Sequence, residues 1–239
     1  MDIKDVAIMP LTNELELVIS ADNSAAIGNK KLDIVQVNDS ITGYFTCRVA
    51  FLDLIRVGAT PKAIVLQNFT GDSAWDCYVQ GIHQLLSETS SKTLPITGST
   101  ESNFQTVQSG LGLTMIGTRR TQQTWQQVLT GEESFAVFGK PLVGNEALEQ
   151  PEHIVPVQLF EQLMKVEGVV DLVPVGSTGI EAEWRQLTNR NDAVTSELDV
   201  KQSGGPATCF IVAYDPQSHA EIKRMSGIYF HELYVSESY

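Results

Sequence analysis

Basic residues are scarce in this chain of 239 residues. It carries 16 Lys and Arg against 29 Asp and Glu, a formal net charge of −13. A surface that binds nucleic-acid phosphates or an anionic membrane needs the opposite excess. Neither nucleic acid nor a membrane is therefore expected as a partner, and the acidic balance is what keeps an ordinary globular protein soluble.

Cysteines, histidines and long apolar runs are also scarce. The three cysteines, Cys47, Cys77 and Cys209, are widely spaced, so neither a disulfide framework nor a zinc site is indicated. The first twenty residues carry acids early and lack a basic segment followed by an apolar stretch, which argues against a secretory signal. No segment has the length of a membrane span. We expect a cytoplasmic protein.

One segment stands out among the residues that are present. Residues 53–61 read D-x4-G-A-x-P. Apolar residues over 46–57 recur at helical spacing, with Asp53 beside the apolar stripe, where it would face a polar site. Gly58 and the following proline stop the helix, and the apolar run over 62–69 predicts a strand. Taken alone, the segment is explained equally well as a helix-to-strand turn.

The order of predicted elements is that of an α+β protein, a mixed β-sheet covered by helices. A rise in Gly, Pro and acidic residues over 139–156 marks a boundary, which gives domains 1–145 and 146–239. Strands are predicted at 15–20, 32–38, 62–69, 94–97, 113–116, 134–138, 169–175, 207–214 and 228–235. Helices are predicted at 46–57, 72–88 (capped by Asp72), 121–129, 157–166, 180–187 and 218–225.

Polar residues gather where these elements end. Four such groups occupy positions 22–24, 38–40, 68–72 and 99–103. A fold that brings the strand ends together would place their carboxylates and hydroxyls in one cleft. A magnesium-nucleotide site needs that arrangement, because Mg²⁺ takes hard oxygen ligands while it bridges phosphates. Each group alone is more readily explained as a turn or cap, but their recurrence at equivalent positions favours a site.

Several short motifs, in order across residues 15–145, resemble those of the PurM-like (AIR synthase-related) ATP-binding superfamily. The D-x4-G-A-x-P segment resembles the signature of that superfamily. The other matches are DNSAAI at 22–27 with GDDAAV, NDS at 38–40 with the metal-binding Asp-Ser/Thr, TGST at 97–100 with GGDT, GLTMIG at 112–117 with a conserved strand, and FGKPLVG at 138–144 with VTGPLG. The sequence departs from these motifs at Ala21, Asn23 and Ser99, which leaves fewer charges around a metal.

The resemblance implies a PurM-like fold, with an N-terminal ATP-binding domain that dimerises into a barrel and a shortened C-terminal α/β domain. It also implies ATP and Mg²⁺ as cofactors and a homodimer. The loops at 21–28 and 96–104 are most similar to those of the α-ribazole kinase branch, which phosphorylates a small nucleoside-like alcohol in cobalamin lower-ligand salvage. Two alternatives stay open: a non-catalytic ATP-binding protein, and an ATP-dependent carbonyl or amide activator of the AIR synthase type.

The same resemblance implies roles for individual residues. The Mg²⁺ ligands would be Asp22, Asp39 and Asp72. Glu101 would be the base for the acceptor hydroxyl, and Asp53 would organise the nucleotide site. The residues expected to contact phosphates or the acceptor are Asn23, Ser24, Asn38, Asn68, Gly98, Ser99, Thr100 and Asn103.

Overall fold

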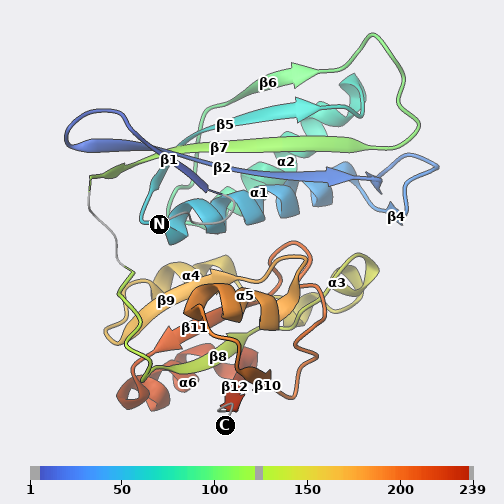
Figure 1. The fold of residues 1–239 in the computed structure, drawn as a ribbon. Coiled ribbons are helices and arrows are strands. Elements are labelled where there is room, and N and C mark those ends of the chain that lie inside the picture. Colours follow the sequence, from blue (N-terminus) through green and yellow to red (C-terminus); the bar gives the residue numbers. More distant parts are fainter. Residues whose placement is uncertain (1–5, 122–125, 237–239) are drawn as a thin grey trace. The chain divides into compact units, whose positions relative to one another are not determined.

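The computed structural model describes residues 6–121 and 126–236, and the chain divides into two compact units, Met1–Thr124 and Trp125–Tyr239 (Figure 1). The division lies earlier in the chain than the boundary expected after residue 145. The reason is strand β8 (Ser134–Phe138), which pairs with β11 (Phe210–Tyr214) and β12 (Phe230–Ser236) of the second unit. Strand pairing, which sequence composition does not reveal, therefore places β8 in the second unit.

The first unit is built on a mixed five-stranded sheet in the order β1-β2-β7-β5-β6. Strands β5 and β6 are parallel, and the other neighbours are antiparallel. The ends of β2, β5 and β6 and the beginning of β7 consequently lie at one edge of the sheet. The strands span Val6–Pro10 (β1), Leu15–Ala25 (β2), Thr60–Asn68 (β5), Ile96–Thr100 (β6) and Gly110–Arg120 (β7).

Two helices, α1 (Asp39–Arg56) and α2 (Trp75–Ser87), cover one face of this sheet (Figure 1). The Ser20 hydroxyl on β2 donates a 2.6 Å hydrogen bond to the Ala50 carbonyl of α1, which identifies the covered face. As predicted, α1 ends before Gly58, whose φ of 78° continues the chain in a conformation that other residues rarely adopt. No helix in the described ranges combines the length and hydropathy needed to cross a bilayer.

The helix predicted over 46–57 begins earlier in the structure, at Asp39, and three further local predictions differ. Only Val35–Gln36 (β4) of the segment 32–38 is a strand, paired with Ile27–Gly28 (β3). Asp72 begins a short 3-10 helix before α2 and makes no capping hydrogen bond.

The third difference concerns the helix predicted over 121–129. Residues 122–125 lie outside the described residues, and positions 126–129 are not helical. The Gln127 N–H instead donates to the Val170 carbonyl, so a tertiary backbone contact replaces the local helical one.

The second unit is built on an antiparallel sheet in the order β10-β12-β8-β11-β9, with β9 at Val169–Pro174 and β10 at Ala193–Thr195. Its helices are α3 (Asn145–Glu149), α4 (Val157–Leu163), α5 (Gly179–Thr188) and α6 (His219–Ser226). The helices and strands predicted after residue 150 are confirmed, each within a few residues of its expected ends.

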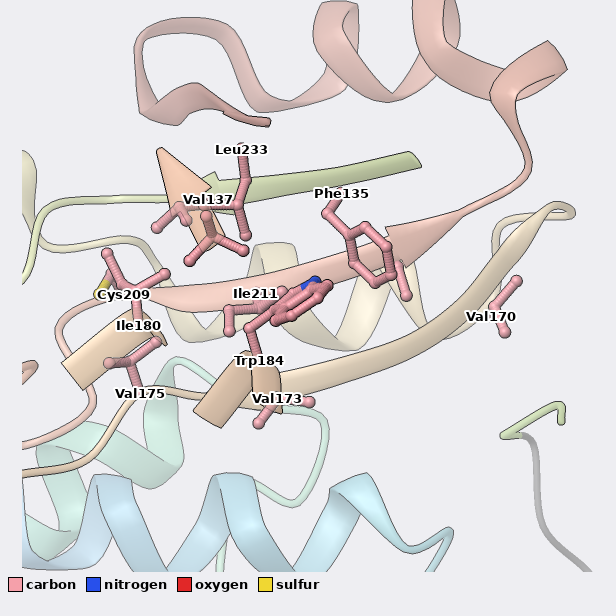
Figure 2. Packing of buried hydrophobic residues seen from close by; sticks show 12 residues of the cluster. Phe135, Val137, Val170, Val173, Val175, Ile180, Trp184, Cys209, Ile211 and Leu233 are labelled. Atoms are coloured by element: carbon pink, nitrogen blue, oxygen red, sulfur yellow. The ribbon is translucent and has the colours of Figure 1, made fainter. Parts of the chain in front are cut away.

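Trp184 of α5 is the largest side chain in the core of the second unit (Figure 2). It is fully buried and meets Phe135 edge-to-face, with ring centroids 5.8 Å apart. On the opposite face of the sheet, Phe160 of α4 meets Phe210 with centroids 5.0 Å apart. Side chains alternate between the two faces of a strand, so α5 and α4 cover opposite faces.

Candidate functional site

The polar groups predicted at strand ends lie together at one edge of the first sheet. The structure therefore joins segments that are far apart in the sequence, as expected. Strand register aligns them in two adjacent rows, Ser24–Leu111–Asn68–Thr100 and Asn23–Gly112–Gln67–Ser99.

The pleat of the sheet separates these two rows. Ser24 and Asn68 share the helix-covered face with Asp22, whereas Asn23 and Ser99 are exposed on the other face. Successive side chains of a strand point to opposite sides, so neighbours in sequence such as Asp22 and Asn23 do not share a cleft. The expectation of one cleft lined by all of these groups is corrected to an edge with two faces.

Two of the predicted contact residues, Asn68 and Asn38, and the predicted base Glu101 make hydrogen bonds that shape the edge itself. Asn68, only 1% exposed, donates to the Gly71 carbonyl (2.8 Å) and to Thr100 Oγ1 (3.2 Å), which ties β5 to β6. Asn38 Oδ1 accepts from the Ser40 N–H at 2.9 Å and caps α1. Glu101 Oε1 accepts from the N–H groups of Asn103 (2.7 Å) and Phe104 (3.2 Å), which leaves its Oε2 atom outside those bonds.

Asp33 is a buried acid at this edge that the sequence analysis missed. Its carboxylate accepts hydrogen bonds from the Ser109 N–H and hydroxyl, both at 2.7 Å, and from the Lys30 N–H at 2.8 Å. Burial alone would raise the pKa of Asp33, but these hydrogen bonds outweigh burial and hold the pKa below its ordinary value. The sequence signal that could have revealed Asp33 is an acidic residue within the mostly apolar segment 32–37.

Asp39 lies beside Asp33 at the start of α1 and is only 8% exposed. Its Oδ1 accepts one bond of 3.2 Å from the Asn29 N–H, and its other oxygen has no hydrogen-bond partner within residues 6–121 and 126–236. Burial raises the pKa of Asp39; the Asn29 bond and the Lys30 charge oppose this, and the negative charge of Asp33 adds to it. A buried carboxylate with so little compensation is a group that a bound cation would stabilise.

Lys30 and Tyr78 complete the surroundings of the two acids. The Lys30 ammonium donates to the carbonyl (2.8 Å) and hydroxyl (2.6 Å) of Thr106. The Tyr78 hydroxyl of α2 lies 2.6 Å from Thr70 Oγ1, which also accepts from the Gly110 N–H. Burial raises the pKa of Tyr78 to about 12, so its hydroxyl stays protonated near neutral pH and links α2 to the beginning of β7.

Gly28 allows the backbone to pass close to this acidic pair. A Cβ atom at Gly28 would lie 2.5 Å from Ser109 Oγ and 2.7 Å from Asp39 Oδ1. Both distances are far below van der Waals contact. Only glycine therefore fits between the two side chains as they stand.

We expect Gly28→Ala to destabilise the protein by about 1–3 kcal/mol, because the new methyl group must displace Ser109 or Asp39. Chemical denaturation measures this cost. Gly71→Ala is the matched control: its φ is 121°, but no atom lies within 4 Å of the added Cβ, so only backbone strain remains. Equal costs for the two variants would contradict the close approach at Gly28.

The remaining predicted acids do not join Asp39 in a preformed cage. Asp72 is exposed at the start of its 3-10 helix. Asp53 lies in the last turn of α1, roughly 20 Å from Asp39 at 1.5 Å per residue, so the two carboxylates do not share a site. Within the described parts of the chain, no three His, Cys, Asp or Glu side chains are grouped to hold a metal. Mg²⁺ is usually held by one or two carboxylates together with substrate phosphates, and Asp39 fits that mode.

No protein-family model matches the chain, and no curated protein matches its sequence. Solved structures do match its fold. Thiamine-monophosphate kinase from Stenotrophomonas maltophilia K279a is 14% identical with a TM-score of 0.62, and the match covers 98% of this chain and 90% of that one. HypE from E. coli, a hydrogenase maturation protein, is 13% identical with a TM-score of 0.62, covering 92% and 80%.

PurL from T. maritima, solved with AMPPCP, is 15% identical with a TM-score of 0.59. That match covers 96% of this chain but only 42% of PurL, so the chain spans less than half the length of PurL. These likenesses extend over nearly all of both units. The PurM-like fold that the sequence motifs imply is confirmed.

Proposed function

We propose that the chain is an ATP-dependent phosphotransferase that acts on a small nucleoside-like alcohol, with α-ribazole as the best candidate. The buried, poorly compensated carboxylate of Asp39 is the observation that carries the proposal. Proteins of the same fold include a thiamine-monophosphate kinase, and PurL of that fold was solved with AMPPCP, an ATP analogue. The α-ribazole assignment rests on the loops at 21–28 and 96–104.

In phosphoryl transfer the protein acts mainly by positioning and by electrostatic stabilisation. Mg²⁺, when bound, would neutralise the nucleotide phosphates. Asp39 would hold it together with those phosphates, and Asp22 on β2 and Asp72 at the start of its 3-10 helix would contribute only once the nucleotide is bound. The backbone N–H groups at the start of the 18-residue helix α1 favour negative charge at the same place. Lys30 supplies a nearby positive charge.

The residues after β6 would serve the transferred phosphate and the acceptor. Glu101 would accept the proton of the acceptor hydroxyl through Oε2, while the hydroxyl oxygen attacks the γ-phosphorus and ADP leaves. Asp53 is left out of this assignment because of its distance along α1. The residues proposed to contact phosphates or the acceptor are Asn23, Ser24, Gly98, Ser99, Thr100 and Asn103, with Asn38 and Asn68 holding the edge in shape.

Release of ADP from MgATP in the presence of α-ribazole tests the proposal. We expect turnover that requires both Mg²⁺ and the acceptor. ATP binding without turnover, with α-ribazole or other small alcohols, would favour the second candidate, a non-catalytic ATP-binding protein. Asn23 and Ser99 favour that candidate, because they replace acids in the family motifs. Phosphate release only with a carbonyl substrate would favour an activator of the AIR synthase type.

We also propose that the chain forms a homodimer through the uncovered face of the first sheet. No helix or strand among the described residues of the first unit covers this face, and its central residues are apolar or small and uncharged. They form two cross-strand rows, Ala7–Ile19–Ile116–Ala63 and Ala21–Thr114–Val65–Thr97. A second copy would bury this surface, since continuous apolar faces of this kind mark association sites.

Ile116→Glu, which places a charge at the middle of this face, is expected to convert the dimer to a monomer. Light scattering after size exclusion measures the mass. Gln84→Glu, at an exposed position of α2, is the matched control and should leave the dimer intact. A wild-type mass equal to one chain, or a dimer that survives Ile116→Glu, would contradict the proposed interface.

A further inference from the structure

The second unit contains a cavity of about 420 Å³ with a polar wall. This volume lies within the range of small-molecule sites. Lys140, Pro141 and Leu142 of its wall belong to the segment 138–144 that resembles VTGPLG, and its other residues lie outside the motif-like segments. The side chains that bear its chemistry are Lys140, Glu146, Glu197, Asp199, Gln202 and His231.

His231 is the most buried of these side chains. It lies on β12, is 9% exposed, and places Nδ1 2.6 Å from Glu197 Oε1. A carboxylate bonded to one ring nitrogen fixes the tautomer and the orientation of the ring. The other nitrogen, Nε2, has no hydrogen-bond partner among the described residues and is available to a molecule in the cavity.

The loop that carries Lys140 is held rigidly. Thr208 is fully buried, and its Oγ1 accepts from the Leu142 N–H at 3.0 Å and lies 2.8 Å from the Lys140 carbonyl. Gly205 has a φ of 50°, and a Cβ there would meet the Leu142 carbonyl. The two loops therefore interlock, and a wall that is ordered in advance lowers the cost of binding.

The charges of the wall select among ligands. Three carboxylates face one ammonium group, which disfavours a phosphate monoester. Hydroxyl groups match the wall well, since carboxylates and an imidazole accept from them. Lys140 Nζ lies 3.2 Å from His153 Nε2, and Gln202 Nε2 donates to Glu146 Oε2 at 2.8 Å, so these two side chains offer a ligand only their remaining N–H groups. Pro141 and Leu198 supply an apolar part against which a sugar ring would pack.

We propose that this cavity binds an uncharged, hydroxyl-bearing small molecule such as a sugar or a nucleoside, with His231 and Glu197 hydrogen-bonding its hydroxyl groups. This site lies within the second unit and does not depend on the proposed function. A neutral sugar or nucleoside is the ligand, and its phosphate ester is rejected.

Isothermal titration of the whole protein tests the ligand class with two matched pairs. The neutral probes are D-ribose and α-ribazole, and their anionic counterparts are ribose 5-phosphate and α-ribazole 5′-phosphate. We expect at least one neutral probe to bind, and its phosphate ester to bind at least about 10-fold more weakly. Equal binding of ester and neutral probe, or no binding of either neutral probe, would overturn the proposal.

Two variants test the assigned residues. His231→Asn and Glu197→Gln should each weaken binding of the neutral probe by about 5-fold or more, because each removes a hydrogen-bonding group from the wall or its support. Glu197 is largely exposed, with 70% of its side chain accessible, so its variant should fold even where the His231 variant does not. Glu221→Gln, at an exposed position of α6, is the control.

AMPPCP binding separates this inference from the proposed function. All three variants should bind MgAMPPCP as the wild type does. Wild-type affinity of the His231 and Glu197 variants for the neutral probe would overturn the cavity assignment while leaving nucleotide binding intact. A wild-type protein that fails to bind MgAMPPCP would contradict the proposed function, and the probe titrations would still decide the cavity.

Discussion

Asp39→Asn is expected to weaken binding of MgAMPPCP by about 100-fold or more, while making the free protein more resistant to thermal unfolding. The loss follows because Asp39 is a buried carboxylate at the edge with an uncommitted oxygen, and altered metal sites lose affinity on this scale. Asparagine keeps the oxygen that accepts from Asn29. The change therefore removes charge with little change of shape.

The gain in stability follows from the direction of the pKa shift. Burial, supported by Asp33, raises the pKa of Asp39 in the folded protein. Protonated Asp39 therefore makes its full stabilising contribution below the pKa that Asp39 has in the unfolded chain. That contribution is lost as pH rises through the pKa that Asp39 has in the folded protein. At neutral pH the ionised group opposes folding, and the asparagine variant is free of that cost.

Thermal melts at neutral pH and near pH 4, without metal, measure this difference. The variant should have the higher Tm at neutral pH, and the advantage should shrink as the wild-type carboxyl becomes protonated. Asp76→Asn, at an exposed position of α2, should change neither Tm nor nucleotide affinity. A less stable Asp39→Asn protein that binds MgAMPPCP normally would show that Asp39 is a structural residue.

Trp184→Ala is expected to destabilise the second unit by about 3–5 kcal/mol, the usual cost of removing a large buried aromatic side chain. The side chain is fully buried and packs on Phe135. Its Nε1 atom is buried without a hydrogen-bond partner among the described residues, which is itself unfavourable. Trp184→Phe keeps an aromatic ring and removes that N–H group, so it should cost less than half as much.

Urea denaturation followed by circular dichroism compares the two variants without relying on tryptophan fluorescence. Trp184→Ala also removes the ring face over which the Arg190 guanidinium lies, 5.7 Å from the Trp184 ring centroid. If Trp184→Phe proved as destabilising as Trp184→Ala, the indole N–H would have a partner, such as a buried water.

The sequence motifs predicted the fold and the edge where the candidate site lies. Local backbone geometry selects the residue types at turns and strand ends, so these positions can be recognised in the sequence. Gly58 stops α1, and the polar groups near Asn68 and Ser99 do meet at one edge. The motifs did not predict which polar groups lie on the same face of the sheet, since that depends on strand register. Asp22 and Asn23 are adjacent in sequence and lie on opposite faces.

Long-range pairing accounts for the other differences. Asp33 reads as part of a strand until the fold brings Ser109 against it. Asp53 belongs to the motif that identified the fold, yet the length of α1 carries it away from Asp39. The cavity at His231 depends on the pairing of β12 with β8. These two strands are far apart in the sequence, and no sequence pattern predicts that they pair.

A crystal structure of the protein with Mg²⁺ and AMPPCP tests the central claim most directly. We predict phosphates at the edge formed by the ends of β2, β5 and β6, with Mg²⁺ bound between them and Asp39. Phosphates bound elsewhere, or a metal that does not contact Asp39, would contradict the account.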